Sequence, residues 1–231
     1  WQFLAWNYCY NRSEEFERVE DKYATIRRGI EIAIEAAATN PRSAQLHWAV
    51  GWAFFHRIGK APETDQFRRL FAADGPFHES LREHVDIDAA LGPDGEPDSF
   101  LVAKLWFAKA SSVADRFGLN EEWMRSTAFH SYPAHSQINF ALAIEYEGVT
   151  GETAVRAWQD AARAWHDYGR LPIEYAPGRT VNFSDLDDLL TLRNELEEQL
   201  KSAPSDADLI SQKIEDVEER MYWTDRYRTL I

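Results

Sequence analysis

Residues 29–54 read GIEIAIEAAATNPRSAQLHWAVGWAF, and this stretch decides the fold. Apolar residues recur at three- and four-residue spacing on both sides of Asn40-Pro41, which is the pattern of two amphipathic helices. The first helix is expected to end at Asn40, because the residue before a proline avoids the α region. Small residues and one large residue then occupy fixed positions: Gly29, Ala33, Ala36, Gly51 and Phe54. Small residues let helix backbones approach, so the stretch predicts two helices that cross closely.

A second stretch repeats this arrangement further along the chain. Its small and apolar positions are Ala141, Ile144 and Gly148 in a first helix, then Ala154, Trp158 and Ala161 in a second. The spacing of these positions agrees with that of a helical-repeat unit once one extra residue is allowed near Thr150-Gly151. Any amphipathic helical hairpin imitates part of such a pattern, but agreement at several positions in two places favours true helical pairs.

Both stretches resemble the tetratricopeptide unit, in which small residues mark the helix crossings and aromatic residues fill the adjacent grooves. The resemblance implies an all-α fold, a tetratricopeptide-like α-solenoid of helical hairpins. Two departures limit it. Gly59 lies one residue beyond the position that the tetratricopeptide pattern gives to its glycine, and the helix after it lacks the series of small residues. Regular stacking is therefore not expected between Gly59 and Phe100.

Turn and loop residues divide the chain into four parts. We expect tetratricopeptide-like pairs over residues 1–73, an irregular acidic insert over 74–99, further pairs over 100–182 and a coiled-coil-like helical hairpin over 183–231. Within the third part, Pro133 is expected to open a helix from about Ala134, and residues 171–182 look extended and irregular.

The last part has its own pattern. Ser202-Ala203-Pro204-Ser205 is expected to turn the chain between two helices. Apolar residues of the second helix repeat at 4-3-4 spacing, at Ile210, Ile214, Val217 and Met221. This spacing is typical of a helical hairpin or a coiled-coil seam.

Composition excludes several classes of function. The formal charge is −14, with 39 acidic and 25 basic residues. A nucleic-acid binder or a protein that docks on anionic lipid by charge would need a positive face. The single cysteine, Cys9, excludes an internal disulfide and a cysteine-based zinc site. No cofactor is expected.

Four blocks of sequence carry a closer resemblance that covers most of the chain. They are Ala5–Asn11, Ile26–Ile30, Phe55–Gly59 and Phe129–Ala134. They resemble a little-characterised family of tetratricopeptide-like proteins from planctomycete-type bacteria. That resemblance implies a hydrophobic membrane anchor and at least one helix pair upstream of Trp1, with the side of the membrane left open. It implies no activity.

Histidines and tryptophans are the candidate functional side chains. No histidine pair has the spacing of a helical zinc motif, and no catalytic or metal-ligating residue is predicted. His56 is expected to be a core or interface histidine, and His130 to lie in a packed corner between helices. Some of seven tryptophans could be exposed anchors for a partner: Trp48, Trp52, Trp106, Trp123, Trp158, Trp165 and Trp223.

The sequence therefore favours a scaffold or assembly protein that binds other proteins, or another copy of itself, through a helical-repeat surface. A structural accessory subunit of a membrane-bound or cell-envelope complex is the alternative. An enzyme using His130 and neighbouring carboxylates is the third interpretation. The chain is expected to bind no nucleic acid, and to contact a membrane only through the implied anchor.

Overall fold

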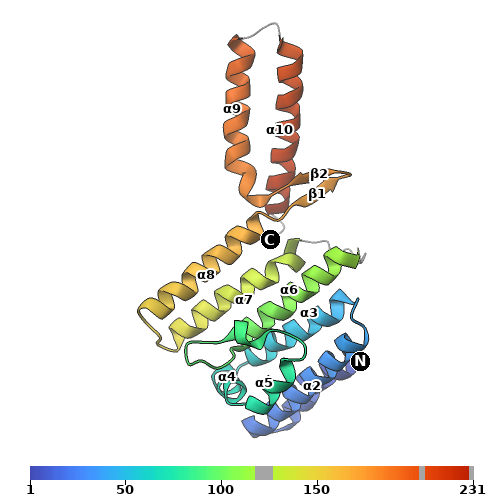
Figure 1. Cartoon of the computed structure of the whole chain (residues 1–231), viewed down its shortest axis with the longest axis vertical. Helices are drawn as coiled ribbons and strands as arrows, with labels where there is room; N and C mark the ends of the chain where they lie inside the picture. The colour runs from blue at the N-terminus through green and yellow to red at the C-terminus, as the bar shows by residue number, and fades with distance from the viewer. Residues whose placement is uncertain (118–126, 203–205, 229–231) are drawn as a thin grey trace. The chain divides into compact units, whose positions relative to one another are not determined.

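A computed structural model describes residues 1–117, 127–202 and 206–228 of the chain. The described residues form two compact units, Trp1–Ala164 and Trp165–Ile231. Both are built mainly from helices, which confirms the prediction of a helical fold, and the second also contains a small β-hairpin (Figure 1). The two units are described separately.

The first unit begins with helices that pack in chain order. Their bounds are α1 (Gln2–Trp6), η1 (Asn7–Asn11), η2 (Arg12–Glu15), α2 (Val19–Thr39), α3 (Ala44–Trp52) and η3 (Ala53–Ile58). The segments η1 and η3 are π-helical continuations of α1 and α3, and η2 is a 3₁₀ turn. As predicted, α2 ends before Asn40-Pro41, and the Ser43 hydroxyl accepts a bond from the Leu46 N–H to cap α3.

Within the described residues, the rest of the first unit consists of three short helices followed by three long ones. Their bounds are α4 (Thr64–Ala72), α5 (Gly75–Leu81), η4 (Ile87–Ala90), α6 (Ser99–Phe117), α7 (Thr127–Tyr146) and α8 (Glu152–Gly169), which continues into the second unit. Figure 1 shows α2, α3, α6 and α7 side by side, and each of them contacts the next. One hydrophobic core runs through the unit, from Ala5 to Ala161.

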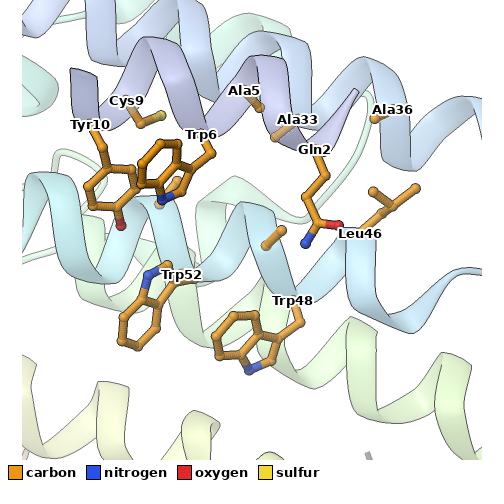
Figure 2. Close-up of a pocket in the computed structure, with 12 residues that line it drawn as sticks. Gln2, Ala5, Trp6, Cys9, Tyr10, Ala33, Ala36, Leu46, Trp48 and Trp52 are labelled. Carbon is orange, nitrogen blue, oxygen red and sulfur yellow. The ribbon is translucent and has the colours of Figure 1, made fainter. Parts of the chain in front are cut away.

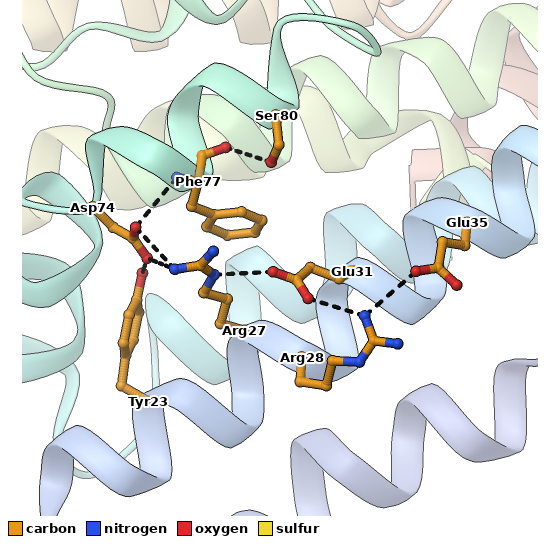
Figure 3. Close-up of polar contacts among 8 residues, drawn as sticks. All are labelled: Tyr23, Arg27, Arg28, Glu31, Glu35, Asp74, Phe77 and Ser80. Atoms are coloured by element: carbon orange, nitrogen blue, oxygen red, sulfur yellow. Dashed lines mark hydrogen bonds and ion pairs between the residues drawn. The ribbon is translucent and has the colours of Figure 1, made fainter.

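The segment 74–99 is more ordered than the expected irregular insert. It contains α5 and η4, and its apolar side chains Phe77, Leu81, Ile87 and Ala90 are buried in the common core. Asp74 explains much of this order, because its carboxylate accepts bonds from the Phe77 N–H, the Tyr23 hydroxyl and the Arg27 guanidinium (Figure 3). The same carboxylate therefore caps α5 and ties it to α2.

The prediction that Pro133 opens a helix is wrong, because Pro133 lies inside α7. A proline inside a helix removes one backbone bond and crowds the preceding turn, at a cost of about 3 kcal/mol. Residues on both sides of it are nevertheless in the core, with Phe129 1% and Ala134 2% exposed. Burial on both sides offsets the cost, so His130 is a helical residue and not part of a corner.

The second unit contains the predicted helical hairpin, formed by α9 (Leu186–Ser202) and α10 (Ala207–Arg228). Leu189 and Leu196 pack against Ile210 and Val217, with Ile214 and Met221 beside them, which confirms the predicted seam. Residues 203–205 of the expected turn lie outside the described ranges. The short turn η6 (Phe183–Asp185) leads into α9.

The extended segment before the hairpin pairs with itself, which was not predicted. Strands β1 (Ile173–Ala176) and β2 (Arg179–Val181) run antiparallel. Gly178, in the turn between them, has a positive φ of 72°, a conformation that glycine adopts without strain. The ring of Tyr175 in β1 stacks with that of Trp223 in α10, at 5.8 Å between centroids.

Candidate functional site

Two of the predicted small residues lie where helix backbones come closest. A Cβ atom on Gly29 of α2 would stand 2.5 Å from the Cys9 sulfur and 2.9 Å from the Ala5 carbonyl oxygen. A Cβ atom on Gly51 of α3 would stand 2.9 Å from the Phe107 ring of α6. Real Cβ atoms do not approach so closely, so both glycines are needed for the crossings at these backbone positions.

The other predicted repeat positions of the first stretch line the same part of the unit. Ala33 and Ala36 are buried on α2. Phe54 is fully buried in η3, where its ring meets those of Phe71 and Phe77 at 5.5 Å and 6.0 Å.

The second set lies on α7, after it and on α8. Ala141, Ile144 and Ala161 are buried in the core. Ala154 is half-buried, and Gly148 has a positive φ of 84° just after α7. Trp158 is 39% exposed, and its indole N–H donates to the Glu145 carboxylate at 3.1 Å. Next to Trp158 on α8, Ala157 is 3% exposed and packs in the core.

A cavity of about 220 Å³ opens between α1 and α3, with α2 behind it (Figure 2). We call it the aromatic groove. Its inner surface is made of small side chains: Ala5, Ala33, Ala36, Ala49 and Ala53. Because these five residues stop at Cβ, three helices can pack closely and still leave a hollow between them.

Aromatic side chains form both walls of the groove. Trp6 and Tyr10, four residues apart on the α1–η1 helix, stack at 5.6 Å between ring centroids. On the facing helix Trp48 stacks with Trp52 at 5.2 Å, and Trp52 stacks with His56 at 5.0 Å. The i, i+4 spacing places each pair on one helix face. The rings are not buried as core residues are: Trp6 is 48% exposed, and Trp48 and Trp52 are half-buried.

A polar contact lies at the Tyr10 end of the groove. The Tyr10 hydroxyl and the His56 Nδ1 are 3.2 Å apart and form a hydrogen bond. Burial, together with the charges of Arg57 and Lys60, lowers the pKa of His56. Burial raises the pKa of Tyr10 to about 12. Both groups are therefore neutral near pH 7, and the end of the groove carries no net charge.

The nearest buried cation, Arg57, already has polar partners. Arg57 donates to the Ser13 hydroxyl at 3.1 Å and to the Glu14 carboxylate at 2.6 Å, and its guanidinium lies over the Tyr10 ring. Burial raises the pKa of the Cys9 thiol, which faces Gly29, to about 12. A thiol with so high a pKa is a poor nucleophile, so Cys9 serves packing.

Both walls end in π-helical turns, η1 and η3, and these turns carry Tyr10 and His56. In η3 the Gly59 N–H reaches back five residues to the Phe54 carbonyl at 3.0 Å. Such turns are rare and are frequent at functional sites, because the widened turn re-aims the side chains it carries. Here they carry the Tyr10 and His56 rings, whose centroids lie 5.7 Å apart.

Of the two histidines singled out in the sequence, His56 contacts two residues that line the groove, Tyr10 and Trp52. His130 is half-buried on α7, next to the ring of Phe129. Within the described ranges, no three His, Cys, Asp or Glu side chains converge in a way that could hold a metal ion. Nor does any helix in those ranges have the length and apolar character to cross a membrane.

Two alanines of the floor, Ala33 and Ala36, were predicted as small positions, whereas Trp6, Tyr10 and the other three alanines were not assigned a role, although the sequence contains a signal. Residues 1–11 and 43–55 contain no Asp, Glu, Lys or Arg, in a chain where 28% of residues are charged. Among the other tryptophans considered as anchors, Trp106 is fully buried, Trp165 and Trp223 are half-buried, and Trp123 lies outside the described residues.

Comparison with protein-family models, with curated proteins and with solved structures finds no match for the chain, so its resemblance to the planctomycete-type family stays a prediction.

Proposed function

We propose that the chain is a tetratricopeptide-like interaction module that binds a partner protein in the aromatic groove. In this reading α1–η1 pairs with α2, α3–η3 pairs with α6, and α7 pairs with α8, with residues 59–98 inserted inside the second pair. The close approaches at Gly29 and Gly51 support the first two pairs. The shared core of Ala141 and Ala161 supports the third.

The observation that carries the proposal is the combination of a real cavity with uncharged, partly exposed aromatic walls. Large aromatic side chains gain about 25 cal/mol for each Å² of apolar surface removed from water. Leaving Trp6 48% exposed therefore forgoes stability that complete burial would supply. An exposed apolar hollow of this kind is typical of a binding site, where the partner completes the burial.

A structural subunit of a larger assembly is the second candidate, and it rests on a different surface. Around the start of α1, Phe3 is 79%, Trp1 59% and Leu4 45% exposed. Permanent contact with another chain would cover this surface. The two candidates differ in the lifetime of the complex, because a structural subunit stays bound through purification and an interaction module exchanges its partner.

Site-specific photo-crosslinking in the native cells tests the proposal. A photoreactive residue replaces Gln2, at the edge of the groove, or Ala38, which is exposed on α2 and does not line the groove. We expect the probe at Gln2 to crosslink one recurrent polypeptide segment, identified by peptide mass spectrometry. The probe at Ala38 should not crosslink that segment. Equal crosslinking from both positions, or none from Gln2, would refute the proposal.

A further inference from the structure

We infer that the aromatic groove receives one bulky, uncharged apolar side chain, of the size of an aromatic ring, from an otherwise neutral segment of a partner polypeptide. This inference rests on the proposed function and adds the chemistry of the anchor. It is argued from the size of the cavity, from its charge and from one polar side chain at its edge.

Size points to a single ring-sized group. The cavity has about 220 Å³. An apolar protein cavity of roughly 150 Å³ already takes up a benzene molecule. The hollow over Ala33 and Ala49 therefore has room for one phenyl or indole side chain, and is too small for several side chains at once. Contact between an incoming ring and the Trp6 or Trp48 ring adds about 0.5–1.5 kcal/mol beyond the buried area.

Charge excludes an ionic anchor. The residues that line the groove include no Asp, Glu, Lys or Arg, and the Tyr10–His56 end is neutral. Arg57, close to that end, already has the Glu14 carboxylate as its partner at 2.6 Å. A carboxylate or an ammonium group entering the hollow would lose its hydration and gain no counter-ion, which costs several kcal/mol.

The edge of the groove favours a polypeptide over a free apolar molecule. Figure 2 shows the Gln2 side chain reaching from α1 toward Leu46 at the open end. Within the described part of the chain no hydrogen bond occupies the Gln2 amide. An amide group has two donors and one acceptor, which match the C=O and N–H groups of a peptide backbone. A backbone that crosses this edge can place one side chain in the hollow.

Binding of small uncharged and charged indoles to the purified chain tests the anchor chemistry. The probes are indole, N-acetyltryptophanamide, tryptamine and indole-3-acetate, and binding is measured by NMR shifts of the chain. We expect the two uncharged probes to bind about a hundredfold more tightly than the two charged ones. Charged and uncharged probes binding alike would overturn the inference.

Two substitutions locate the binding and identify the role of Gln2. Ala33→Leu fills the hollow and should weaken both uncharged probes at least tenfold, whereas Ala38→Leu on the exposed side of the same helix should change nothing. If Ala33→Leu fails to fold, Ala49→Leu from α3 replaces it. Gln2→Ala should weaken N-acetyltryptophanamide about fivefold, the value of one hydrogen bond, and leave indole unchanged.

The outcomes separate the two proposals. If the Leu substitutions leave binding unchanged, or if Gln2→Ala affects indole as much as the amide, the anchor inference fails. The proposed function can still stand in that case, because crosslinking from Gln2 does not depend on which side chain enters the hollow. If crosslinking fails while the uncharged indoles bind in the hollow, the groove binds a ring but the function proposed for it is wrong.

Discussion

Replacing Gly29 by alanine tests whether the α1–α2 crossing depends on a missing side chain. The new methyl group would stand 2.5 Å from the Cys9 sulfur, 2.9 Å from the Ala5 carbonyl oxygen and 3.0 Å from the Cys9 nitrogen. Two of these three atoms belong to the backbone of the facing helix. A change of rotamer cannot move them, so α1 and η1 would have to shift away from α2.

Two opposing effects set the size of the change. Alanine inside a helix is favoured over glycine by up to about 1 kcal/mol. An extra methyl group in a close-packed contact costs about 1–3 kcal/mol. Because two of the contacts at Gly29 are shorter than 3.0 Å, the upper part of that range applies. We expect Gly29→Ala to lower the free energy of unfolding by about 1–2 kcal/mol, or the melting temperature by roughly 2–8 °C.

The assay is urea unfolding followed by tryptophan fluorescence and far-UV circular dichroism. Gly75→Ala is the control, since Gly75 begins α5 and a Cβ atom there meets nothing within 4 Å outside its chain neighbours. The control should change stability little, because the helix preference of alanine is opposed by crowding of its Cβ against Pro76. In a Cys9→Ala background the cost of Gly29→Ala should shrink, because the shortest contact is gone. A loss of stability in Gly29→Ala no larger than that in Gly75→Ala would refute a close crossing.

Three further predictions concern pH, a buried carboxylate and a proline. Burial lowers the pKa of five histidines below the ordinary 6.5: His47, His56, His78, His84 and His135. The unfolded chain binds more protons, so their contribution to stability is present above about pH 6.5 and is lost as the pH falls through the folded pKa values. The urea midpoint should drop between about pH 7 and pH 5, and a constant midpoint would contradict this. Asp74→Ala removes the α5 cap and the acceptor for Tyr23 and Arg27, and should cost about 2–3 kcal/mol, against almost nothing for the exposed Glu35→Ala. Pro133→Ala restores a helical bond in α7 and should raise stability by about 1 kcal/mol; a lower melting temperature would contradict this.

Helical spacing and turn residues were enough to predict the long helices. The end of α2 at Asn40-Pro41 and the α9–α10 seam are local features, because they depend on residues three and four apart on one or two neighbouring helices. The strands were missed for a physical reason. With four and three residues, β1 and β2 are too short to show an alternating pattern, and only Pro177-Gly178 marked the turn.

Pro133 and the segment 74–99 show the limit of local signals. Proline carries a strong local preference against a helix interior, and Asp74-Gly75-Pro76 reads as a break. In the structure, long-range burial outweighs the first preference. In the second case the break is itself a helix start, with Asp74 as cap and Pro76 in the first turn of α5. The partners that decide each outcome lie elsewhere in the chain, so residue spacing could not reveal them.

The groove itself combines a feature that the sequence contains with one that it does not. Uncharged runs at 1–11 and 43–55 are visible in the sequence, and burial alone would be the simplest explanation for them. Burial accounts for part of the walls, because Trp48 and Trp52 are half-buried and their rings also contact Tyr132 on α7. It does not account for Trp6 and Gln2, which are exposed. A charged residue at an exposed position costs the core nothing, as Arg28 and Glu35 show on α2 (Figure 3). That Trp6 and Gln2 are uncharged as well, beside an alanine floor, is what the proposed apolar occupant would require, because a charge at the groove would disfavour its entry.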